Sequence, residues 1–146
     1  MIYEEIAEIF KKHGSPLSPV ENELFYEDET EIPEHCILLA KEYKTRMIDF
    51  LNGEDMTQQI KRDDLFIKVM YFYRNIMDPS NNQIEEWLNS DETAASLFTK
   101  LTSIYEQEGW NDITAVPFNY ETVESKHILE EFYQNAITHF RKGCFK

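Results

Sequence analysis

The fold depends on one apolar stretch, LFIKVMYFYRNIM at residues 65–77, which only Lys68, Arg74 and Asn75 interrupt. At about 100° per residue, the polar residues of the surrounding segment fall on one narrow stripe, while almost every other direction is apolar from residue 65 onward. The stripe consists of Thr57, Lys61, Asp64, Lys68 and Asn75. Because this pattern is typical of a helix buried on most sides, we predict a central helix over residues 57–78.

Residues 65–73 are also rich in β-forming side chains and could instead form a central strand. Two observations favour the helix. The polar stripe keeps a helical period, and the chain offers no second run that could pair with such a strand. In the helix, Phe66, Met70 and Tyr73 project away from the stripe, so they are expected to be largely buried.

The glycines and prolines fall between or at the edges of the remaining periodic segments, which places helix boundaries there. Ser18-Pro19-Val20-Glu21 and Ser80-Asn81-Asn82-Gln83 match capping boxes that open short helices, the first ending near Tyr26. Longer helices are expected over 2–13, 33–52 and about 121–142, with another from Ser90 to just before Gly109. We therefore predict an all-α, single-domain bundle of about six helices spanning 1–146, with one irregular segment at 110–119.

Composition fits a folded domain of modest size. A chain of 146 residues is long enough to bury roughly 70% of the surface that its unfolded form exposes, and its 42% hydrophobic content is sufficient for a packed core. No apolar run approaches the roughly 18 residues of a membrane span, and the N-terminus is acidic rather than signal-like, which predicts a cytoplasmic location without membrane contact. Cys36 and Cys144 lie far apart, as expected of thiols in a reducing compartment.

The net charge of −14 is unevenly distributed. Residues 13–40 contain seven acids and no Lys or Arg, and residues 75–125 contain ten acids and only Lys100. The bases concentrate in residues 41–74 and at the C-terminal tail. Such a field disfavours direct binding to nucleic acid or to an anionic membrane and favours a basic protein partner. The alternative is that the acidity serves solubility alone.

Few residues indicate a catalytic or metal-binding site. Glu124 and His127 match the Glu-x-x-His ligand pair of di-iron bundles, but that site needs a second such pair, and no other histidine has a Glu three residues before it. Glu131 is a third candidate contributor. The chain has no Gly-rich phosphate loop, nucleophile elbow, zincin motif or dinucleotide fingerprint, so the sequence predicts no cofactor and no catalytic residue.

The strongest candidate for partner binding is a cluster that combines acids with aromatic rings. It comprises Phe25, Tyr26, Glu27, Asp28, Glu29 and Glu31. Trp87, Trp110, Phe118 and Tyr120 also lie in short or irregular segments, where an aromatic ring serves either as an interface anchor or as core.

The function predicted from these patterns is that of a non-enzymatic, acidic, cytoplasmic binding protein that engages a basic protein partner. Small size, acidity and the lack of catalytic motifs are typical of bacterial or phage inhibitors of the immunity, antitoxin or anti-defence kind, some of which imitate the charge of nucleic acid. Two alternatives remain open: a small helical enzyme or metal-binding bundle with a site around Glu124 and His127, and a structural subunit of a larger assembly.

Overall fold

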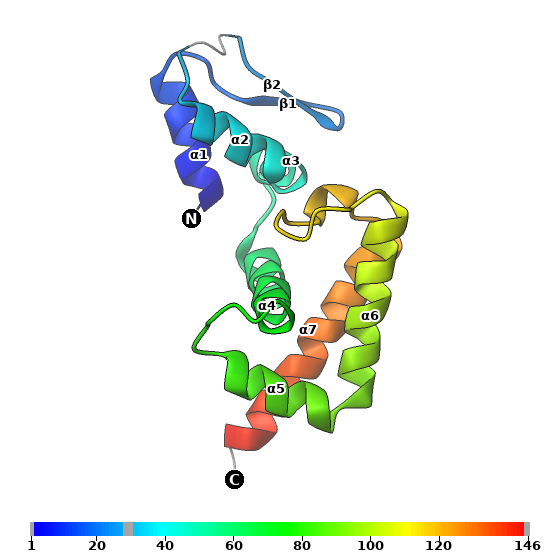
Figure 1. Ribbon diagram of the computed structural model, residues 1–146. Coiled ribbons are helices and arrows are strands. Elements are labelled where there is room, and N and C mark those ends of the chain that lie inside the picture. The colour runs from blue at the N-terminus through cyan, green and yellow to red at the C-terminus, as the bar shows by residue number, and fades with distance from the viewer. Residues whose placement is uncertain (1, 28–30, 145–146) are drawn as a thin grey trace. The chain divides into compact units, whose positions relative to one another are not determined.

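The computed structural model describes residues 2–27 and 31–144, with the backbone alone for residues 142–144. Over these residues the protein has seven α-helices, one short 3-10 helix and one hairpin of two strands (Figure 1). The predicted all-α fold class is confirmed. Contacts between Cα atoms divide the chain into two compact units, Met1–Met56 with Asp112–Asn119, and Thr57–Asn111 with Tyr120–Lys146. The single domain over 1–146 stays a prediction.

The first unit begins with α1, Ile2–Lys12, an amphipathic helix that buries Tyr3, Ile6 and Phe10. As predicted, Gly14 caps the C-terminal end of this helix, with a φ of +76°. The amide of Ser15 donates to the Phe10 carbonyl and the amide of Gly14 donates to the Lys11 carbonyl, which is the Schellman pattern that closes many helices.

The helix predicted from Ser18 to Tyr26 is wrong, because these residues form a β-hairpin. Its strands are β1, Ser18–Val20, and β2, Glu23–Phe25, which pair antiparallel with Ser18 opposite Phe25 and Val20 opposite Glu23. The capping-box interpretation of Ser18 fails with that helix. Polar Glu21-Asn22 separates two short segments that contain β-forming Val20 and Phe25, which is compatible with a hairpin that has a two-residue loop.

The hairpin loop contains a strained residue, which gives a test of this register. Glu21 has a φ of +57°, a region that costs a residue with a β-carbon roughly 1–2 kcal/mol. Glu21→Gly is expected to raise the free energy of unfolding by up to about 1 kcal/mol, because the relief of strain exceeds the entropy that glycine loses on folding. Urea denaturation measures the change.

The matched control is Asn75→Gly, since Asn75 also has a φ of +57° but asparagine tolerates this region. Asn75→Gly should therefore be closer to neutral. A loss of stability in Glu21→Gly would contradict the loop geometry.

The single helix predicted over 33–52 is also wrong, because it is broken at Tyr43 into α2, Glu34–Glu42, and α3, Lys44–Leu51. Tyr43 has φ −103° and ψ 26°, outside the helical region. The break leaves carbonyls at the end of α2 and an amide at the start of α3 without partners inside their own helices.

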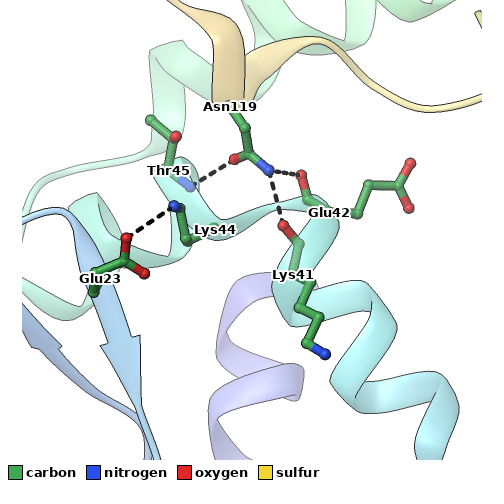
Figure 2. Close-up of polar contacts among 6 residues, drawn as sticks. All are labelled: Glu23, Lys41, Glu42, Lys44, Thr45 and Asn119. Atoms are coloured by element: carbon green, nitrogen blue, oxygen red, sulfur yellow. Dashed lines mark hydrogen bonds and ion pairs between the residues drawn. The ribbon is translucent and has the colours of Figure 1, made fainter. Parts of the chain in front are cut away.

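One side chain from far along the chain satisfies these groups (Figure 2). Asn119 Nδ2 donates to the carbonyls of Lys41 at 2.8 Å and Glu42 at 3.0 Å. Asn119 Oδ1 accepts from the Thr45 amide at 2.9 Å. The carboxylate of Glu42 in turn accepts from the Val116 amide at 3.1 Å. The irregular segment predicted at 110–119 thus exists, and its part within the first unit acts as a strap across the α2–α3 break.

The strap also contributes to the core of the first unit. The Phe118 ring is completely buried, and the guanidinium of the equally buried Arg46 lies 4.8 Å from its centre. This is a cation–π geometry that stabilises a charge removed from water.

The second unit contains α4, Thr57–Tyr73, α5, Asn81–Ser90, α6, Glu92–Gln107, and α7, Val123–Cys144. The 3-10 turn Phe118–Tyr120 crosses the boundary between the two units. Within the second unit, α6 and α7 pack side by side in antiparallel orientation, and α4 contacts both α5 and α7 (Figure 1).

The helical prediction for residues 65–73 is confirmed, although α4 ends at Tyr73 rather than at Asp78. Asn75 adopts positive φ and its amide donates to the Phe72 carbonyl, while the Ile76 amide donates to the Tyr71 carbonyl. The same Schellman geometry as at Gly14 therefore ends the helix before the predicted boundary at Asp78.

Phe66 is buried as predicted, since only 1% of it is exposed. Met70 is half-buried. The prediction for Tyr73 is wrong, since 51% of it is exposed. Tyr73 stacks one face on Phe98, with ring centres 5.2 Å apart, and its position at the end of the helix leaves the rest of the side chain in solvent.

The N-terminal caps of the next two helices differ from the predictions at Ser80 and Ser90. Ser80 occupies the N-cap position of α5, but its side chain makes no capping hydrogen bond. Its hydroxyl and amide instead donate to the Asp78 carboxylate, and these hydrogen bonds lower the pKa of Asp78. Helix α6 is capped by Asp91, which accepts from the Ala94 amide at 3.1 Å, while Ser90 belongs to α5.

No helix within residues 2–27 and 31–144 is both long enough and apolar enough to cross a membrane.

Candidate functional site

The exposed face of the hairpin carries two large apolar side chains. Paired residues of an antiparallel ladder project to the same face, so Ser18, Val20, Glu23 and Phe25 share one side of the sheet. Val20 is 55% exposed and Phe25 is 52% exposed. Pro19 and Leu24, on the opposite side, are half-buried. The sheet therefore presents apolar surface to solvent at a place where ordinary alternation would put polar residues.

A groove lies beside this face within the first unit. It has a volume of about 580 Å³ and is lined by Pro16, Leu17, Ser18, Phe25, Tyr26 and Glu27. We call it the hairpin groove. Its wall is mainly apolar and also includes the exposed residue Glu27. The size is that of a site for a few side chains or a small molecule.

The wall of the hairpin groove is held in place by contacts with α1 and with Ser15, which follows the C-terminal turn of that helix. Ser15, only 1% exposed, accepts a hydrogen bond through Oγ from the Glu27 amide at 2.8 Å. The Tyr26 ring meets Phe10 edge to face, with centres 5.2 Å apart. Because these contacts order the wall before binding, a ligand would lose less free energy in ordering it.

The structure brings together three of the six residues predicted to bind a partner. Phe25, Tyr26 and Glu27 line the hairpin groove, and Glu31 is exposed but does not line it. Asp28 and Glu29 lie outside the described residues.

The sequence prediction missed the other three lining residues, Pro16, Leu17 and Ser18. The capping-box interpretation of Ser18 placed a helix there, so these residues had no reason to face Phe25. The signal that could have revealed them was the polar pair Glu21-Asn22 between two short segments with β-forming Val20 and Phe25, with Pro16 and Pro19 just before it.

The acids around the hairpin groove face water. All the described acids of segment 13–40 are exposed: Glu21, Glu23, Glu27, Glu31 and Glu34. Glu23 has a basic neighbour, since one of its carboxylate oxygens lies 3.6 Å from Lys44 Nζ (Figure 2). The described acids of this charge run are therefore accessible to an approaching partner.

The alternative site on α7 is open to solvent. Glu124, His127 and Glu131 are all exposed. Over the described part of the chain, no group of three or more His, Cys, Asp or Glu side chains is placed so that it could hold a metal ion. The thiol of Cys36 is buried, and the neighbouring His35 is exposed.

Three of the four aromatic residues singled out in short or irregular segments belong to the core. Trp87 and Phe118 are fully buried, and Trp110 is 4% exposed. Trp87 also donates through its indole nitrogen to Asn135 at 3.0 Å. Tyr120, at 38%, is the exposed one, so among these four only Tyr120 presents much surface to a partner.

Comparison of the chain with known protein families, with curated proteins and with solved structures finds no match in any of the three.

Proposed function

We propose that this is a binding protein that engages a basic region of a partner protein through the hairpin groove and the acids beside it. The observation that carries the proposal is the position of exposed Phe25 in the wall of a preformed groove, next to the exposed carboxylate of Glu27. An interface hot spot usually contains an aromatic ring that loses its remaining contact with water on binding, with charged residues at the surrounding rim.

The charge of the chain supports a basic partner. A net charge of −14 on 146 residues makes the acids repel one another in the free protein. A partner with a positive surface relieves this repulsion and is attracted from a distance, which raises the association rate. The narrower form of the proposal is an inhibitor that covers the positively charged groove of a nucleic-acid-binding protein.

The first test is the salt dependence of association. The full chain serves as bait in the source cell, the partner is eluted with salt, and the association rate of the purified pair is measured at about 50 mM and 500 mM salt. The Debye length falls from roughly 14 to 4 Å over this range, so we expect the rate to fall by an order of magnitude or more. Equal rates at both salt concentrations would contradict an electrostatic mechanism.

Charge reversal then tests the location of the binding surface. Changing Glu27, Asp28, Glu29 and Glu31 together to Lys should slow association and flatten its salt dependence while helicity is unchanged. The control reverses four exposed acids in α5 and at the C-terminal end of α6, namely Glu85, Glu86, Glu106 and Glu108, and alters net charge equally. If both variants lose the same fraction of the rate, total charge rather than this surface governs association.

Phe25→Ala tests the apolar anchor without any change in charge. Because Phe25 is half exposed in the free protein, its truncation should affect dissociation of the complex more than folding. A dissociation rate that stays within about twofold of the wild-type rate would remove Phe25 from the interface.

A further inference from the structure

A second groove lies within the other unit, between α4 and α7. It has a volume of about 410 Å³ and is lined by Leu65, Tyr133, Ala136, Ile137, Phe140 and Arg141. We call it the α4–α7 groove. The α7 residues recur at three- and four-residue spacing, so they form one continuous stripe along the helix. Apart from buried Ala136 and exposed Arg141, the lining residues are half-buried. An apolar stripe of the kind that usually packs in a core is therefore partly open to solvent.

Four bases of the second unit belong to the sides of α4 and α7 that line this groove. Lys61 and Arg62 lie four and three residues before Leu65, and Lys68 lies three residues after it. At these spacings all three bases are on the same side of α4 as Leu65. Arg141 contributes its side chain directly to the lining. Two basic segments that are far apart in the sequence therefore meet beside one apolar groove, in a chain whose net charge is strongly negative.

Part of this positive charge is incompletely neutralised. Lys68 pairs closely with Asp64, with Nζ and Oδ2 3.0 Å apart. Arg62 is paired more loosely, because its Nη1 lies 3.8 Å from Glu130 Oε1, beyond hydrogen-bonding distance. Its Nε is buried and has no hydrogen-bond partner among the described residues. The Arg62 side chain is 22% exposed, so its guanidinium can gain a hydrogen bond from an added carboxylate or other acceptor.

We propose that the α4–α7 groove binds an acidic amphipathic segment of a partner protein. The segment inserts an apolar side chain beside Ile137 and places carboxylates near Arg62 and Arg141. Charge complementarity selects the occupant: a basic segment, which suits the hairpin groove, would be repelled here. The inference is independent of the function proposed for the hairpin groove.

The experiment selects peptides from a displayed random library on the immobilised full-length protein. The enriched peptides are expected to combine large apolar residues with net negative charge. Synthetic copies should bind Ile137→Glu and Arg141→Glu at least tenfold more weakly than the wild type, because the first substitution places a carboxylate in the groove and the second reverses the charge in its lining.

Two controls separate this site from other effects. Lys100→Glu makes the same charge change as Arg141→Glu at an exposed position of α6 outside the groove, and should alter the affinity by less than about twofold. Phe25→Ala should leave peptide binding unchanged, which distinguishes this site from the hairpin groove. If Ile137→Glu fails to fold, Arg141→Glu still decides the outcome, because Arg141 is exposed. The proposal is overturned by a lack of enrichment, by basic or neutral enriched peptides, or by binding that is indifferent to these substitutions.

Discussion

Truncating Phe66 to Ala is expected to lower the free energy of unfolding by about 3–5 kcal/mol. The Phe66 side chain is 1% exposed and lies at the centre of the aromatic core of the second unit. Its ring centre is 5.3 Å from that of Phe98, 5.6 Å from that of Tyr105 and 6.4 Å from that of Trp110. Removing the ring leaves a cavity bordered by three large, rigid side chains that cannot easily move into it.

Phe72→Ala is the matched control, because it removes the same atoms from the same helix. Phe72 is only half-buried, so its truncation loses less transfer free energy and leaves a site open to water. Urea denaturation followed by circular dichroism compares the two variants. A loss in Phe66→Ala no larger than that in Phe72→Ala would show that the aromatic core is not organised around Phe66.

The contrast between Phe66 and Tyr73 shows what the periodicity of a sequence can predict. The helical stripe indicates the direction of each side chain, and that direction was correct for Phe66. Burial also depends on what covers a residue, and Tyr73 lies in the last turn of α4, which the αL conformation of Asn75 closes. The sequence pattern assigns Asn75 to the polar stripe, although asparagine just after the last turn of a helix can also terminate the helix.

The two errors in the first unit have different physical origins. The hairpin at Ser18–Phe25 has a local signal, but the same Ser-Pro sequence also fits a helix cap, and the packing of α3 against both strands favours the sheet. The break at Tyr43 has no local signal, because neither glycine nor proline is present there. Its hydrogen-bond partner, Asn119, is more than 70 residues away.

For that reason Asn119→Ala is expected to be among the most damaging substitutions of a polar residue, lowering the free energy of unfolding by about 2–4 kcal/mol. The asparagine amide makes three hydrogen bonds to the backbone at the α2–α3 break, and each contributes roughly 0.5–1.5 kcal/mol. Alanine leaves the Thr45 amide and the carbonyls of Lys41 and Glu42 without this partner. Asn111→Ala, at an exposed asparagine outside the first unit, is the control and should change stability by no more than about 0.5 kcal/mol.

Asn119→Asp separates the two halves of this contact. A carboxylate can still accept from the Thr45 amide, but it cannot donate to the carbonyls of Lys41 and Glu42, and its negative charge faces their oxygens. We therefore expect Asn119→Asp to be no more stable than Asn119→Ala, although it is the smaller change in shape. Hydrogen exchange shows where the effect occurs. In Asn119→Ala the exchange rate of the Thr45 amide should increase by more than the global loss of stability accounts for. Wild-type stability in Asn119→Ala, together with unchanged protection of Thr45, would mean that the break at Tyr43 is stable without the strap.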